Sequence, residues 1–127
     1  MTRWLSIAVL LVTSGCTAQY RCFTRIEIHN SCASPVHTIL ENHSNLGGEN
    51  LMSFDIASGA TTVGGEIYGI NCDLNRSVLD GYKITFDTNT AHKEMGRSEI
   101  ISRLISNQEK STRDSRYWLL DTGDFCR

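Results

Sequence analysis

Short stretches in which apolar and polar residues alternate run along most of the chain from residue 22 onward. The stretch 82–87, YKITFD, alternates most regularly, with Tyr82, Ile84 and Phe86 on one side and polar residues on the other. A period of two is typical of a β-strand with one buried and one exposed face. The same reasoning predicts five further strands, at 22–30, 36–42, 51–56, 60–70 and 116–120.

Clusters of turn-forming residues separate these stretches. The segments NSCASP at 30–35 and HSNLGGEN at 43–50 are typical of loops. The pair Gly64-Gly65 falls inside the predicted strand 60–70, which indicates either a β-bulge or a second tight turn.

The segment 98–107, SEIISRLISN, has the period of a helix instead. Its apolar residues fall on one helical face: Ile100, Ile101, Leu104 and Ile105. Ser98 is the predicted N-cap, and Glu99 with Arg103 forms a favourable pair four residues apart. We therefore expect one late helix that packs its apolar face on a sheet.

Six strands and one helix predict a β-rich α+β fold, built as a small antiparallel sheet or sandwich and held by two disulfides. The chain of 127 residues is short enough for a single domain, which we place at 22–127, and its 40% hydrophobic and 20% charged residues are ordinary for a globular protein. The formal charge of −2 argues against a nucleic-acid partner, because such partners need a clustered basic surface.

The first sixteen residues differ from the rest of the chain. Arg3 precedes an apolar run of nine residues at 4–12, WLSIAVLLV. This run is shorter than the roughly 20 residues of a membrane-spanning helix but suits the apolar region of a signal peptide. With Ser14, Gly15 and Cys16 directly after it, the leader resembles a bacterial lipoprotein signal, although Thr13 stands where leucine is usual.

The resemblance implies a lipid-anchored protein. Residues 1–15 would be removed as a signal peptide, Cys16 would carry acyl chains such as palmitate, and 16–21 would form a short tether. Thr17, in place of an aspartate, implies the periplasmic face of the outer membrane rather than the inner one. Two other interpretations remain open: cleavage before Gln19, which would release the protein without Cys16, and a leader that folds as a buried apolar strand.

Four cysteines remain once Cys16 is assigned to the lipid, and an even number in an exported protein indicates disulfides: Cys22, Cys32, Cys72 and Cys126. Structural zinc sites use closely spaced cysteine pairs, which these four do not form, so we expect no metal.

The pairing of these cysteines can be narrowed. Cys22 and Cys32 lie at opposite ends of a predicted strand that spans roughly 30 Å, whereas a disulfide joins Cα atoms about 5.5 Å apart. That pair is excluded and two connectivities remain. If the strands run strictly up and down and the helix crosses back, Cys22 pairs with Cys72 and Cys32 pairs with Cys126. We favour this pairing, although a Greek-key connection would change it.

Candidate catalytic chemistry is limited to one short motif. Two apolar residues followed by Asp121-Thr122-Gly123 resemble the active-site strand of a retroviral-type aspartic protease. Only four residues follow Gly123, too few to build the rest of such a site, so we expect a strand end that runs into a turn. The four histidines are scattered, and no zinc-protease, P-loop or dinucleotide motif is present. We therefore expect no catalytic residues, no cofactor and no enzyme.

These observations predict a non-catalytic envelope lipoprotein that acts as a structural or protein-interaction component. Its partners would be the membrane, through the acyl anchor, and another envelope protein. The alternative is a secreted or tethered inhibitor or immunity protein that blocks a lytic enzyme with a rigid loop such as 43–50.

Overall fold

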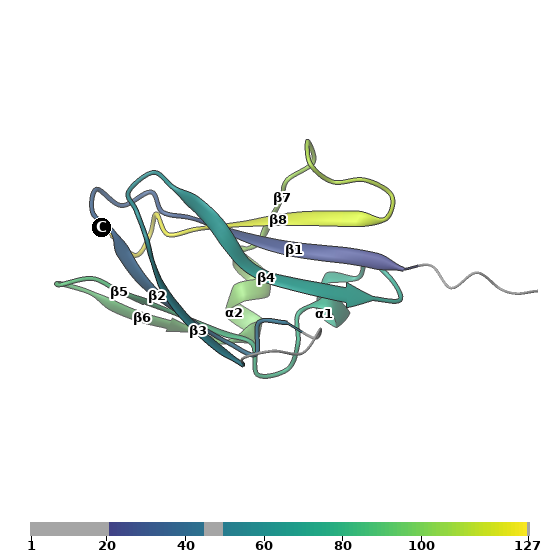
Figure 1. The fold of residues 1–127 in the computed structure, drawn as a ribbon, viewed down its shortest axis with the longest axis horizontal. Helices are drawn as coiled ribbons and strands as arrows, with labels where there is room; N and C mark the ends of the chain where they lie inside the picture. Colours follow the sequence, from purple (N-terminus) through teal and green to yellow (C-terminus); the bar gives the residue numbers. More distant parts are fainter. Residues whose placement is uncertain (1–20, 45–49, 127) are drawn as a thin grey trace, which may run out of the picture.

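The computed structural model describes residues 21–44 and 50–126, which form two four-stranded β-sheets (Figure 1). The first, here called the β1 sheet, has the order β4-β1-β8-β7, formed by Thr61–Gly69, Cys22–His29, Ser115–Asp121 and Ile105–Ser106. The second, the β2 sheet, has the order β3-β2-β5-β6, formed by Leu51–Ile56, Val36–Glu41, Lys83–Asp87 and His92–Met95. Two short helices complete the described elements, α1 at Leu74–Ser77 and α2 at Arg97–Arg103. The β-rich character expected from the sequence is confirmed.

The two sheets enclose one hydrophobic core. The alternating residues of the strands supply its fully buried side chains, among them Ile26, Ile28, Val36, Leu40, Ile84, Phe86 and Leu120. The sheets approach each other at one end and separate toward the other, where α2 lies between them (Figure 1). Helix α2 contacts β5 and β6 on one side and β8 on the other. Its fully buried Ile100 therefore helps to fill the wider end of the sandwich.

The first and last strands are neighbours in the β1 sheet. β8 pairs with β1 in parallel, so that Trp118 lies beside Ile26 and Leu120 beside Ile28. The other strand pairs are antiparallel. The sequence predicted an antiparallel sheet or sandwich of about six strands, whereas the described residues form eight strands, one pair of which is parallel. The parallel pair arises because the chain crosses to the β2 sheet and back before β8 is added to the free side of β1.

The late helix differs from its prediction at both ends. It begins at Arg97 with Gly96 as the N-cap residue and without a side-chain cap, so the assignment of Ser98 as N-cap is wrong. It ends at Arg103, and Leu104 leads into β7, where Ile105 pairs with Leu119 and is 66% exposed. Pairing with β8 ends the helix early, and Ile105 therefore lies outside the core.

The predicted bulge in the fourth strand is present. Ile26 pairs with Gly65 and Glu27 with Val63, which leaves Gly64 as the extra residue of β4. A Cβ atom at Gly64 would lie 2.6 Å from Cδ1 of Ile28, so the close approach of β4 to β1 requires glycine here. The buried Tyr82 hydroxyl donates a hydrogen bond to the Gly64 carbonyl, and burial raises the pKa of Tyr82. The bulge thus connects the two sheets.

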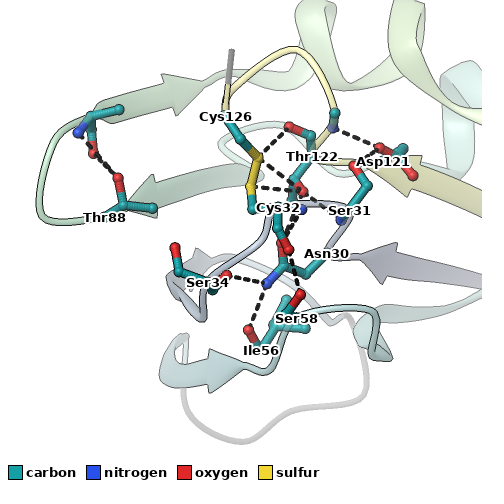
Figure 2. The surroundings of a disulfide bond; sticks show 12 residues. Asn30, Ser31, Cys32, Ser34, Ile56, Ser58, Thr88, Asp121, Thr122 and Cys126 are labelled. Atoms are coloured by element: carbon teal, nitrogen blue, oxygen red, sulfur yellow. Dashed lines mark hydrogen bonds between the residues drawn. A yellow bond between two sulfur atoms is a disulfide. The ribbon is translucent and has the colours of Figure 1, made fainter.

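One disulfide lies at each end of β1. Cys22 is bonded to Cys72, with Cα atoms 5.2 Å apart, and Cys32 to Cys126, with Cα atoms 5.5 Å apart (Figure 2). This is the connectivity that the sequence analysis favoured. The strands do not run up and down in a single sheet, so the pairing is as predicted although the assumed topology is not.

Candidate functional site

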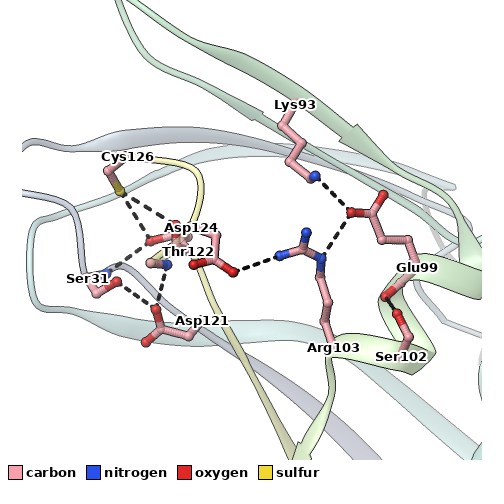
Figure 3. Close-up of polar contacts among 10 residues, drawn as sticks. Ser31, Lys93, Glu99, Ser102, Arg103, Asp121, Thr122, Asp124 and Cys126 are labelled. Atoms are coloured by element: carbon pink, nitrogen blue, oxygen red, sulfur yellow. Dashed lines mark hydrogen bonds and ion pairs between the residues drawn. The ribbon is translucent and has the colours of Figure 1, made fainter.

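The motif Asp121-Thr122-Gly123 forms a turn at the end of β8 (Figure 3). The exposed Asp121 accepts two hydrogen bonds on Oδ1, each of 2.6 Å, one from the Ser31 hydroxyl and one from the Gly123 backbone N–H. A Cβ atom at Gly123 would lie 2.8 Å from the same oxygen, so glycine allows the tight turn. The carboxylate therefore closes a turn, as the sequence analysis expected.

Thr122 and Asn30 form a buried polar junction beside the Cys32–Cys126 disulfide (Figure 2). The Thr122 hydroxyl accepts from the Ser31 N–H at 3.0 Å and donates to Asn30 Oδ1 at 3.2 Å. The Asn30 side-chain amide donates to the carbonyls of Ile56 and Ser34, at 2.8 and 3.0 Å. Because Ile56 ends β3, this junction ties the end of β1 to the β2 sheet. The conspicuous sequence motif is thus part of the scaffold.

A second polar arrangement lies on the outer face of the β2 sheet. Nε2 of His37 is 3.0 Å from the Ser53 hydroxyl, and Nδ1 is 2.7 Å from the Asp55 carboxylate. The order Ser–His–Asp is that of a hydrolytic triad, but such a triad needs a buried acid and a water-excluded site. Here the side chains of His37 and Asp55 are 45% and 72% exposed. Sequence analysis missed this set because it is built by the pairing of β2 with β3.

The remaining polar residues near His37 do not form a metal site. Asp87 lies opposite His37 on β5 and contacts His92 of β6, and a shallow hollow beside them is also lined by Ser34 and Asn89. Within 21–44 and 50–126, no three His, Cys, Asp or Glu side chains are placed so that they could hold a metal ion.

The outer face of the β1 sheet carries a cluster of aromatic side chains around an arginine, which we call the aromatic patch: Phe23 and Arg25 of β1, Tyr68 of β4 and Tyr117 of β8. The ring of Phe23 lies 4.9 Å from that of Tyr68 and 6.2 Å from that of Tyr117, measured between centroids. The guanidinium carbon of Arg25 lies 5.2 Å from the Phe23 centroid and 5.7 Å from the Tyr117 centroid. These distances are typical of aromatic and cation–π contacts.

The aromatic patch is held in place yet open to solvent. Arg25 donates to Glu66 on β4 at 2.6 Å, which fixes the guanidinium between the rings. Tyr68 is 51% exposed. The apolar surface continues along the same face with Val63 and Ile105, which are 40% and 66% exposed. Glu27 lies between Val63 and Ile105 on this face, and its carboxylate accepts two hydrogen bonds from Lys110, at 2.9 and 3.1 Å.

The patch was not evident from the sequence. The signal was present in Phe23, Tyr68 and Tyr117, which occupy outward positions of three strands. Only the strand order β4-β1-β8 brings them together.

Comparison with known proteins finds no matching family model, no matching curated protein and no matching solved structure. None of the helices at 21–44 and 50–126 is long and apolar enough to cross a membrane. Cys16 and most of the loop at 43–50 lie outside the described residues.

Proposed function

We propose that this protein is a non-catalytic, lipid-anchored component of the bacterial envelope that binds another envelope protein through the aromatic patch. The observation that carries the proposal is the cluster of Phe23, Arg25, Tyr68 and Tyr117 on one outer face of the sandwich, in which Tyr68 is exposed and the other three side chains are half-buried. Aromatic residues and arginine are enriched among the residues that contribute most to protein–protein binding.

The order of the patch before binding supports this role. Arg25 is held between two rings and by Glu66, so its side chain has little freedom left to lose when a partner covers it. Ordering long side chains is one of the main entropic costs of association. A patch that rests on three paired strands presents its rings as a fixed surface.

The other outer face of the sandwich is different in character. On the β2 sheet, Lys83 pairs with Glu41 at 2.8 Å and with Glu94 at 3.6 Å, and the pairs His37–Asp55 and His92–Asp87 lie beyond them. Charged pairs of this kind are well solvated and contribute little to binding. The contrast between the two faces favours the β1 sheet as the interface.

The proposed anchor is the acylated Cys16, and the proposed location is the periplasmic face of the envelope, at the outer membrane. Each buried CH₂ of an acyl chain contributes about 0.8 kcal/mol, so several chains hold a protein firmly. We expect the protein with Cys16→Ser to leave the membrane fraction and to carry no labelled fatty acid, with both disulfides still formed. Wild-type protein that is unlabelled, not membrane-bound and begins at Gln19 would refute the anchor.

The interface is tested by photo-crosslinking of the full-length protein in cells. A benzophenone amino acid at Tyr117 should form a covalent adduct with one envelope protein, whereas the same group at His37 on the opposite face should not. The yield of the adduct at Tyr117 should fall several-fold when Arg25→Ala is introduced, because the patch then loses its central contact.

The identity of the adduct separates the two candidate functions. A structural envelope protein supports the proposal. A lytic enzyme whose activity falls on binding would favour an inhibitor or immunity protein instead. Equal adducts from Tyr117 and His37, or none from Tyr117, would refute the aromatic patch as the interface.

A further inference from the structure

The end of the sandwich at which the chain enters β1 has a distinctive surface. β1 begins there, β4 ends there and α1 lies beside them (Figure 1). We call this region the tether end and define it as residues 21–22, 69–77 and 111–116. Ile70 lies at this end directly after β4 and is 68% exposed, the largest exposed fraction among the described large hydrophobic residues.

The tether end is also positively charged. It contains four arginines, Arg21, Arg76, Arg113 and Arg116, against two acidic residues, Asp73 and Asp114, which makes a formal charge of +2. The whole chain has a formal charge of −2. Positive charge is therefore concentrated at one end of a protein that is negative overall.

The length of the chain before β1 limits how far this end can be from the anchor. Only the five residues 17–21 separate Cys16 from Cys22. At about 3.3–3.6 Å per residue they span roughly 20 Å at most. Cys22 is in turn bonded to Cys72, so the loop that carries Ile70 is held close to the start of β1.

We propose that the tether end rests on the lipid surface to which the protein is anchored, with Ile70 inserted at the headgroup level and the arginines facing anionic phosphates. The inference rests on the proposed anchor at Cys16. An exposed apolar side chain among arginines is the pattern of interfacial membrane contacts. Each basic residue near an anionic membrane surface contributes about 1 kcal/mol of attraction.

This contact would orient the whole sandwich. With the tether end on the lipid, the strands of the β1 sheet rise away from the membrane and the aromatic patch faces sideways. A partner in the same membrane could then reach the patch by lateral diffusion.

The test uses the full-length acylated protein in vesicles of phosphatidylethanolamine and phosphatidylglycerol that contain bromine-labelled acyl chains. Bromine quenches tryptophan fluorescence only at short range. We expect Ile70→Trp to be quenched several-fold more than Val63→Trp, the matched control, which is an exposed position on β4 seven residues before Ile70. Trp118 contributes the same background fluorescence in both variants. Replacing the anionic phosphatidylglycerol with phosphatidylcholine should lower the quenching of the tryptophan at position 70.

The outcomes separate this inference from the proposed anchor. Protein that floats with the vesicles but shows equal quenching at the two positions would overturn the orientation and leave the anchor standing. Protein that does not float at all would overturn both. If a benzophenone amino acid at position 70 forms adducts with protein instead of lipid in cells, the tether end is a protein interface and the inference is wrong.

Discussion

Two buried polar side chains, Asn30 and Thr122, show how much of this fold depends on single residues. Asn30 uses its amide for Ile56 and Ser34, and its oxygen accepts from the Cys32 N–H at 2.9 Å and from Thr122. A buried backbone group that loses its partner costs about 1–3 kcal/mol. The junction is therefore sensitive to changes that keep size but remove a hydroxyl.

We predict that Thr122→Val lowers the free energy of unfolding by about 1–3 kcal/mol, because the Ser31 N–H loses its acceptor and Asn30 loses a donor. Thr122→Ser is the control: it keeps the hydroxyl and loses one methyl group, worth about 0.8 kcal/mol. Urea unfolding of the two variants measures the difference. Equal stability of the Val and Ser variants would show that the hydroxyl contributes nothing.

The residues that resemble catalytic groups allow a separate prediction. We expect no peptide or ester hydrolysis by the purified protein, and no change with Asp121→Ala or Ser53→Ala, because Asp121 closes a turn and the His37 set is open to water. Chromogenic ester and peptide substrates provide the measurement. Turnover that disappears in either variant would make the corresponding group catalytic.

The elements were predictable from the sequence where one face of a strand is buried. The stretches that became β1, β2 and β5 alternate clearly, and their inward residues reach the core, whereas β8 was recognisable by its run of apolar residues, of which only Leu120 is fully buried. By contrast, β6 has the sequence HKEM, with a single fully buried residue, and β7 is two residues long. Neither pattern is strong enough to indicate a strand, because these edge strands are specified by their neighbours. The helix α1 is four residues long, which is too short to show a helical pattern of apolar residues.

Helix α2 is held to β6 by an ion pair that gives a pH-dependent prediction. The Glu99 carboxylate accepts from Lys93 at 2.8 Å and from Arg103 at 3.0 Å, and its pKa is lowered, mainly by the hydrogen bond from Lys93. A carboxylate whose pKa is lower in the folded than in the unfolded state stabilises the fold at pH values above its unfolded pKa of about 4.3. This contribution is lost as the pH falls through the lowered pKa of the folded state.

We therefore expect Glu99→Gln to be slightly less stable than wild type at neutral pH and equally stable once the pH is below the folded pKa of Glu99. The effect is small because the carboxylate is 36% exposed. Glu109→Gln, at an exposed position in the loop before β8, serves as the control for the loss of one negative charge. A Glu99→Gln deficit that persists unchanged at low pH would contradict the ion-pair explanation.

At the scale of the whole molecule, the two disulfides close loops that cover most of the domain. The bonded cysteines are 50 and 94 residues apart in the sequence. Loops of this length contribute about 4–5 kcal/mol each in the chain-entropy estimate. The total stability of a domain is about 5–15 kcal/mol.

We predict that the double variant Cys32→Ala/Cys126→Ala loses about 4 kcal/mol of unfolding free energy and that reduction of both disulfides abolishes cooperative unfolding. Denaturant titration with and without reductant measures this, and peptide mapping should never link Cys22 to Cys32. A fully reduced protein that unfolds at the wild-type denaturant concentration would show that the bonds are dispensable.

The aromatic patch is the part of the molecule that was least predictable from the sequence. Phe23 and Tyr68 are 45 residues apart and Tyr68 and Tyr117 are 49 residues apart, and no local pattern relates them. Their proximity depends on β8 being placed beside β1, which is a long-range event. The turn at Asp121, in contrast, is a local feature of adjacent residues, Asp121 and Gly123, and such turns can be recognised from the sequence.

The parallel pairing of β1 with β8 also determines when the protein can finish folding. β1 is formed by residues 22–29 and its parallel neighbour β8 by residues 115–121, so a chain that emerges N-terminus first presents β1 long before β8. Until then one edge of β1 has no partner, and such edges invite association with other chains. Native contacts so distant in sequence also slow folding. The free edge of β1 therefore stays open to association with other chains until β8 has been added to it.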